Sequence, residues 1–181
     1  DFRPYRYFLD HSVANVQQDL DCATLFFENG DSAAFDFVIF ADGITSTGRQ
    51  LVFPEAVPEY SGYVGWRGTV PENELSPESM KLMGDALGYA FVDDGHICMY
   101  PIPGPNGEIT AGSRLMNYVY YQNVAHGAEL DAMMTDIDGI RGIVSVPPGR
   151  VQEKYIREMK KHATETLPPA TAELVTKTAQ P

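Results

Sequence analysis

Four residues near the start of the chain have the types and spacing of a ligand site: Asp42, Gly43, Ser46 and Arg49. They follow the apolar run 37–41, which predicts a buried strand that ends in a tight turn before a short helix. In open α/β sheets, ligands bind beyond the carboxyl ends of strands, where a carboxylate and the amides of a glycine turn can meet a sugar or phosphate. An ordinary strand and turn is the alternative, because Asp-Gly pairs are common in turns.

The elements that must position these residues predict an α+β fold. The first part of the chain predicts short strands, with a hairpin turn at Asn29-Gly30 whose residues tolerate positive φ. The middle predicts an antiparallel sheet interrupted by a helix, with Ser76 as N-cap and Pro77 as its first residue. Later helices are expected to pack around that sheet. The expected strands are 6–9, 12–17, 23–28, 33–40, 60–70, 88–92, 96–102 and 114–124, and the expected later helices are 127–135, 151–166 and 169–178.

Composition and charge narrow the class of protein. With 181 residues, of which 44% are hydrophobic, the chain can bury a sizeable core. Its net charge of -12 argues against a nucleic-acid partner, which needs clustered Lys and Arg. Cys22 and Cys98 form no disulfide framework and have no metal-ligand spacing with the four histidines, so no metal is expected. Because neither a membrane-spanning stretch nor a signal peptide is visible, we expect a cytoplasmic protein without a membrane partner.

The Asp-Gly run resembles the fingerprint of the class A flavoprotein aromatic hydroxylases, the group typified by para-hydroxybenzoate hydroxylase. Asp42, Gly43, Ser46 and Arg49 meet the family pattern of an apolar strand, Asp-Gly, one or two residues, Ser, two residues and Arg. Further matches lie at residues 16–19, 27–31 and 62–68, while 100–104, 117–123 and 145–149 look most like the dihydroxypyridine hydroxylase branch. The resemblance covers nearly the whole chain.

This resemblance implies three regions and an incomplete flavin site. Residues 1–58 would be part of an FAD-binding α/β domain, 59–150 a substrate-binding sheet, and 151–181 helices that lead back to a further FAD-binding segment. The family's Gly-x-Gly-x-x-Gly turn, which brings a backbone close to a pyrophosphate, does not occur in the sequence. The family's Gly-Asp motif would be expected shortly after Pro181. We therefore expect an internal piece of a longer flavoprotein, and an isolated chain that is inactive.

The implied chemistry is hydroxylation of an aromatic or N-heteroaromatic ring. In the family, NADH or NADPH reduces FAD, the reduced flavin reacts with dioxygen, and a flavin C4a-hydroperoxide transfers oxygen to a ring held over it by a sheet. The protein supplies orientation and excludes water. Tyr, Arg or His donors near a ring hydroxyl favour the phenolate, which attacks the peroxide more readily. The resemblance assigns cofactor binding to the four residues of the Asp-Gly run.

Strand alternation selects the candidate substrate residues. In the run 114–121, Arg114, Tyr118 and Tyr120 point to one face together with Met116, and Leu115, Asn117, Val119 and Tyr121 point to the other. The first set resembles the family strand that begins with a flavin-contacting Arg. We therefore predict Arg114, Tyr118 and Tyr120, with Tyr100 from the adjoining strand, as catalytic residues around the ring. The alternative for each tyrosine is a packed core residue with its hydroxyl at the edge of the sheet.

Two functions of different classes remain open. The first is the middle portion of an FAD- and NAD(P)H-dependent monooxygenase, whose partners would be a small aromatic or N-heteroaromatic substrate and dioxygen. Whether it forms a homodimer stays open. The second is a non-catalytic module that uses the same sheet to bind an aromatic ligand or to self-associate through exposed apolar surface. The flanking coding sequence distinguishes them, because only the first function requires the two missing flavin motifs.

Overall fold

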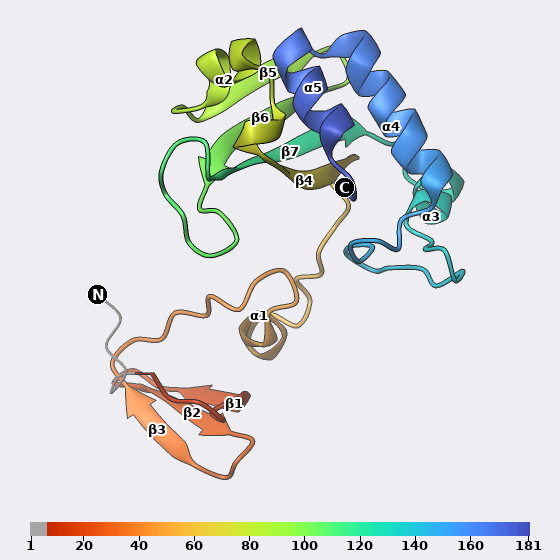
Figure 1. Cartoon of the computed structure of the whole chain (residues 1–181). Helices are drawn as coiled ribbons and strands as arrows, with labels where there is room; N and C mark the ends of the chain where they lie inside the picture. Colours follow the sequence, from red (N-terminus) through yellow and green to blue (C-terminus); the bar gives the residue numbers. More distant parts are fainter. Residues whose placement is uncertain (1–6) are drawn as a thin grey trace. The chain divides into compact units, whose positions relative to one another are not determined.

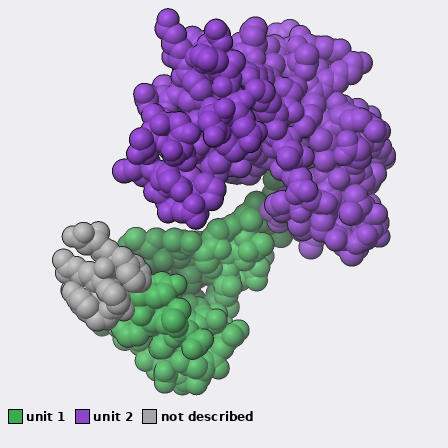
Figure 2. Space-filling view, in the orientation of Figure 1, with its two compact units in different colours: residues 1–59 green, residues 60–181 purple. Residues whose placement is uncertain are grey.

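The computed structural model describes residues 7–181, and the chain divides into two compact units, Asp1–Glu59 and Tyr60–Pro181 (Figures 1 and 2). The first unit holds an antiparallel sheet in the order β1-β2-β3, followed by helix α1. The hairpin turn between β2 and β3 is where it was predicted: Gly30 has a φ of 92°, and the Asn29 and Asp31 side chains are hydrogen-bonded to each other. The elements are β1 (Val13–Gln18), β2 (Ala23–Phe27), β3 (Ser32–Phe35) and α1 (Thr47–Val52).

The predicted strand 33–40 is wrong beyond its first residues. β3 ends at Phe35, and the run that leads to Asp42 is irregular, with Phe37 78% and Ile39 76% exposed. A strand persists only where a neighbour pairs with its amides and carbonyls, and no described residue pairs with the chain beyond Phe35. The predicted strand 6–9 is also wrong over residues 7–9, while Arg6 lies outside the described residues.

The second unit is a four-stranded antiparallel sheet in the order β4-β7-β6-β5, with helices packed on it. Its α2 begins as predicted, because the Ser76 hydroxyl accepts a hydrogen bond from the Ser79 amide and Pro77 is the first helical residue. The strands are β4 (Tyr63–Pro71), β5 (Gly88–Val92), β6 (Gly95–Ile102) and β7 (Leu115–Asn123). The helices are the 3-10 helix η2 (Glu72–Glu74), α2 (Pro77–Met83), α3 (Ala128–Met133), α4 (Glu153–Thr166) and α5 (Pro169–Lys177).

The core of this unit lies between one face of the sheet and the helices. Figure 1 shows α2, α4 and α5 on the same side of the sheet. α4 contributes Met159 and Ala163, and α5 contributes Leu174 and Val175, all buried. The buried sheet residues that meet them alternate along the strands: Trp66, Val70, Ile97, Met99, Met116, Tyr118 and Tyr120. The α+β prediction, an antiparallel sheet with packed helices beside strands of a second domain, is confirmed. Across the described part of the chain, no helix is long and apolar enough to cross a bilayer.

Candidate functional site

The Asp-Gly turn of the first unit is organised by its own side chains. The Ser46 hydroxyl donates to Asp42 Oδ1 at 2.6 Å, and the Gly48 amide donates to Asp42 Oδ2 at 3.1 Å. Ser46 caps α1 in turn, because its hydroxyl oxygen accepts the Arg49 amide at 2.9 Å. The hydrogen bond from Ser46, followed by that from the Gly48 amide, holds the pKa of Asp42 below its ordinary value. The carboxylate therefore serves as a negatively charged anchor for the start of α1.

Two positions of the turn require glycine. Gly43 has a φ of 79°, in the left-handed region that favours glycine. At Gly48, a Cβ would lie 2.0 Å from the Phe40 ring, so only glycine fits against that side chain. The Arg49 guanidinium donates to the Ile44 carbonyl, which folds it back over the turn. All four residues assigned to the cofactor thus lie together, and the hydrogen bonds of their side chains stay within the turn and the start of α1.

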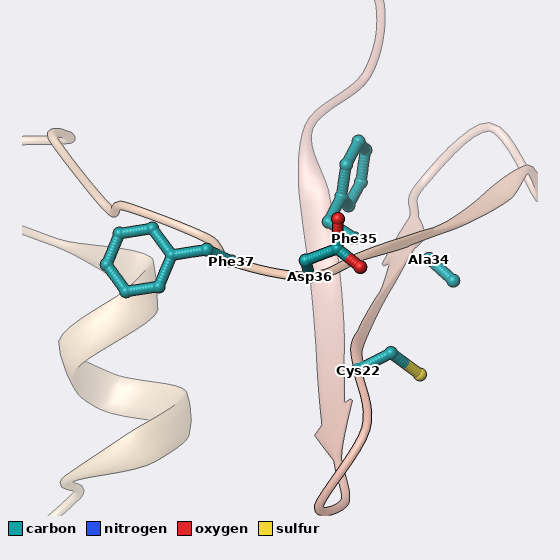
Figure 3. Close-up of a pocket in the computed structure, with 5 residues that line it drawn as sticks. All are labelled: Cys22, Ala34, Phe35, Asp36 and Phe37. Atoms are coloured by element: carbon teal, nitrogen blue, oxygen red, sulfur yellow. The ribbon is translucent and has the colours of Figure 1, made fainter.

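A pocket opens beside this turn. One part is lined by Cys22, Phe35, Asp36 and Phe37 together with Ala34 (Figure 3). An adjoining part of about 480 Å³ includes Ser46, Gly48 and Arg49 among its walls. Cys22 is a free thiol. The pocket is therefore a hollow with many apolar side chains, edged by the carboxylates of Asp19, Asp21 and Asp36 and the guanidinium of Arg49, on the unit that carries the Asp-Gly turn.

The second unit offers a different surface, the face of its sheet opposite the helices, which we call the open face. Residues that face each other in register share a face, so the pairs Tyr121–His96 and Val119–Cys98 place their side chains on it. Tyr89 and Phe91 of β5 join them and are 55% and 78% exposed. The open face comprises Tyr63, Gly65, Arg67, Thr69, Tyr89, Phe91, His96, Cys98, Tyr100, Asn117, Val119 and Tyr121.

Aromatic rings form a continuous band across the open face. His96 stacks on Tyr121 with ring centroids 4.6 Å apart. Tyr63 meets the other side of Tyr121 edge-on at 5.3 Å, and Phe91 approaches His96 at 5.8 Å. Next to this band, Gly65 lets the Tyr121 ring and the Val119 side chain lie close over β4, since a Cβ at Gly65 would be 3.4 Å from each of them. A flat array of π faces suits a planar ring, which stacks or packs edge-on against such groups.

Polar groups lie within this apolar band. The Cys98 side chain shares a hydrogen bond with Tyr89, and this contact, more than any other, raises the pKa of the Tyr89 hydroxyl. Arg67 and Thr69 project from β4 on the same face. The open face therefore combines π surface with the hydroxyl of Tyr89 and the guanidinium of Arg67, which can orient a hydroxylated ring, while the Cys98 thiol is buried beneath them.

The four predicted catalytic residues do not line one pocket. Tyr118 and Tyr120 are fully buried on the helix-covered face, where they belong to the core. Tyr100 pairs with Asn117 in register and therefore lies on the open face. The alternation within β7 was predicted correctly, but the grouping of Tyr100 with Tyr118 was wrong, because it did not take account of the register between β6 and β7.

Tyr118 and Tyr120 differ in how their hydroxyls are satisfied. Tyr120 Oη lies 2.6 Å from His162 Nδ1 on α4, and Gln122 Nε2 lies 2.7 Å from the same nitrogen. The Tyr118 hydroxyl has no hydrogen-bond partner of good geometry among the described residues, although Thr178 is near enough to affect it. Burial raises the pKa of Tyr118 to about 12. The Tyr120 hydroxyl is thus bonded to the helix layer, while the Tyr118 hydroxyl is buried without a well-aligned partner among the described residues.

Arg114 is held in an ion-pair cluster at the end of the sheet. Its Nη2 lies 2.8 Å from Glu72 Oε1 and 3.1 Å from Asp85 Oδ1, and it donates to the Gly84 carbonyl at 2.6 Å. The hydrogen bond with Glu72, followed by that with Asp85, raises the pKa of Arg114. Its guanidinium therefore joins the ends of β4 and α2 to the start of β7.

The sequence interpretation missed most of the aromatic band. It did not select Tyr63, Tyr89, Phe91, His96 or Tyr121. Alternation alone identifies the two faces of each strand but does not reveal which face the helices cover. The burial of Trp66 and the exposure of Arg67 provide that information, since adjacent strand residues point opposite ways. A signal was present in the alternating run Tyr89-Ala90-Phe91, whose larger side chains share one face.

Comparison with known proteins bears on both units. A family model described as "FAD binding domain-like" matches residues 60–181. The chain belongs to this FAD-binding-like family. The chain is also 35% identical over 157 residues to a 2,6-dihydroxypyridine 3-monooxygenase of Paenarthrobacter nicotinovorans. The aligned region covers 87% of this chain and 38% of that protein. A 6-hydroxynicotinate 3-monooxygenase of Bordetella bronchiseptica is 32% identical over 97 residues, 54% of this chain and 24% of that protein.

The solved structures agree with the sequence relatives. The structure of 2,6-dihydroxypyridine-3-hydroxylase from Arthrobacter nicotinovorans matches 99% of this chain with a TM-score of 0.73 and 31% identity. That match covers 44% of the hydroxylase chain, so this FAD-binding-like chain spans less than half the length of the relatives named here. The resemblance to the FAD-dependent aromatic hydroxylases, and to their dihydroxypyridine branch, is confirmed.

Proposed function

We propose that this chain is the substrate-binding middle portion of an FAD- and NAD(P)H-dependent monooxygenase that hydroxylates an aromatic or N-heteroaromatic ring with dioxygen. Residues 1–59 would supply one side of the cofactor site, and the sheet of the second unit would hold the ring. The observation that carries the proposal is the aromatic band of the open face, on a unit that matches an FAD-binding-like family. A cytoplasmic location and a homodimer belong to the same proposal.

The residues for FAD fit in part. A carboxylate has about four acceptor sites, and Asp42 uses two of them within its own turn. The exposed remainder can accept ribose or ribityl hydroxyls, while Gly43 lets a ligand approach the backbone. When bound, FAD would supply the oxygen chemistry. The chain's own contribution is Asp42 and Arg49 at the cofactor's edge.

The open face would orient the ring and favour its reactive form. His96 and Tyr121 offer π faces, and Arg67 offers a positive charge that stabilises a phenolate-type anion. Tyr89 and Tyr100 can hydrogen-bond ring substituents. Of the residues first predicted as catalytic, only Tyr100 lies on this face. The sheet would be stabilised by Tyr118 and Tyr120 on its helix-covered face and by Arg114 at its end.

Titration with 2,6-dihydroxypyridine tests the proposed function. We expect saturable binding by calorimetry that weakens about tenfold, or about 1.4 kcal/mol, in Tyr121→Leu and His96→Ala. Tyr120→Phe on the covered face is the matched control and should bind like the unaltered chain. Equal binding by all variants, or no binding by the unaltered chain, would count against the open face as the substrate site.

A further inference from the structure

The loop that joins β6 to β7 is longer than the hairpin requires. Ile102 and Leu115 are register partners, so the ends of residues 103–114 lie side by side. Two adjacent antiparallel strands need a connection of only about two to five residues, and long ordered loops in compact domains are usually functional. Figure 1 shows this loop leaving the sheet on the side away from α2, α4 and α5. The loop therefore leaves the sheet on the side of the open face.

A buried carboxylate fixes the base of the loop. Glu72 is 2% exposed, its Oε1 lies 2.8 Å from Arg114 Nη2, and its Oε2 accepts the Gly112 amide at 2.5 Å. The Glu72 amide also donates to the Arg114 carbonyl at 3.0 Å. Removal of one partner from such a buried pair leaves an uncompensated charge. Glu72 thus determines where the returning strand of the loop enters the sheet.

The tip of the loop is held by short-range contacts. The Gly104 amide donates to the Glu108 carbonyl at 2.8 Å, and the Asn106 amide donates to Glu108 Oε2 at 2.9 Å. Residues 105–107 and 109–113 are exposed, with Ile109 at 77%. A segment with a buried anchor, a locally ordered turn and few packed side chains has the physical features of a loop that opens at low cost.

We propose that residues 103–113 cover a planar hydroxylated ring bound on the open face, and that Glu72 is the positioning residue that sets this cover. The proposal rests on the proposed function. Ile109 would supply apolar contact with the ring or with the band around it, and closure would exclude water, which strengthens the polar contacts beneath it. Arg114 shares this role, since its guanidinium is committed to Glu72, Asp85 and Gly84.

A double-mutant cycle tests the cover. The first variant is Glu72→Gln, and the second replaces residues 104–113 by Asn-Gly, which suits a tight hairpin turn. Each should weaken 2,6-dihydroxypyridine binding about tenfold, and the combined variant should weaken it no further, because residues that act as a unit are not additive. Asp136→Asn is the control, since it alters another buried carboxylate, 6% exposed, that accepts two backbone amides and pairs with Arg150.

Hydrogen exchange gives a second readout on the same proteins. Amides of residues 104–113 should gain protection when the unaltered chain binds the ring, and should lose that gain in Glu72→Gln. Additive effects in the cycle, or unchanged loop exchange on binding, would overturn the cover while the open face remained a binding site. Absence of any binding by the unaltered chain would overturn the proposed function and the cover together.

Discussion

At the scale of single residues, the same side-chain type serves different purposes on the two faces of one strand. Tyr121 and Tyr120 are neighbours in β7, yet the first stacks on His96 at the open face and the second is hydrogen-bonded to His162 under α4. Residue type alone therefore does not identify a ligand contact. What separates the two tyrosines is which face the helices cover.

The Tyr118 hydroxyl gives a residue-scale prediction with a pH signature. Its pKa rises from 10.0 to about 12 on folding, so the folded chain keeps the proton that the unfolded chain loses. This proton contributes roughly 2 to 3 kcal/mol to the free energy of unfolding. The contribution is fully present below pH 10 and is lost as the pH rises through about 12. Tyr118→Phe should remove this loss and should leave ring binding unchanged.

Urea unfolding at pH 8 and at pH 11 measures this effect. At pH 8 we expect Tyr118→Phe to be more stable than the unaltered chain by about 1 kcal/mol, because an unpaired buried hydroxyl is removed. The advantage should grow at pH 11. A loss of stability at both pH values would show that the hydroxyl makes a favourable bond in solution.

The Asp-Gly turn gives a second residue-scale prediction. Asp42→Ala removes the acceptor for Ser46 and Gly48, so the start of α1 should become less stable locally. Hydrogen exchange at the Gly48 and Arg49 amides should speed up. Ser46→Ala should act through the same network, with less than additive effects in the double variant. Thr47→Ala, at an exposed position of the same helix, should change neither amide.

At the scale of elements, the helices and hairpins were largely predictable because their signals are local. The Ser76 cap, Pro77 and the apolar face of α4 fixed helices close to their observed bounds. The segment after Phe35 was not predictable in this way. Its apolar, β-branched run has strand propensity, but pairing decides the outcome, and the described residues offer no partner strand. The grouping of Tyr100 with Tyr118 on one face failed for the same reason, since register is a property of two strands.

The contact between α2 and α5 gives an element-scale prediction. Glu173 on α5 accepts hydrogen bonds from the Ser76 amide and the Ser79 hydroxyl and pairs with Lys177 at 2.8 Å. These contacts lower the pKa of Glu173 from 4.5 to about 2, and the contact with Lys177 contributes most. A depressed folded pKa gives stability that is present above pH 4.5 and is lost as the pH falls through about 2.

Glu173→Gln should therefore lower the melting temperature at neutral pH. The curves of the variant and the unaltered chain should converge as the pH falls from about 4.5 to about 2, where the native carboxyl is protonated as well. Glu165→Gln is a suitable control, because its carboxylate is 60% exposed and pairs at 3.8 Å with Lys161 alone. A difference that persists unchanged to pH 2 would show that the charge of Glu173 is not what stabilises the helix contact.

At the scale of the whole molecule, the two units carry different parts of one proposed activity. The first unit has the Asp-Gly turn and the pocket beside it, and the second has the open face and the helices that fix it. The sequence contains no Gly-x-Gly-x-x-Gly turn, and the chain spans 38% of the dihydroxypyridine monooxygenase relative. Ring binding and flavin binding should therefore be separable in this chain.

That separation is the last prediction. The chain should bind a hydroxylated pyridine but should neither retain FAD nor oxidise NADH or NADPH, because Asp42 and Arg49 would contact only one edge of the cofactor and the sequence has no Gly-x-Gly-x-x-Gly turn for the pyrophosphate. FAD retention is measured by incubation with excess FAD, desalting and a visible spectrum. Binding of the hydroxylated pyridine is measured by calorimetry. A stoichiometric yellow flavin band after desalting would contradict the prediction and would show that the turn and its pocket suffice to hold FAD.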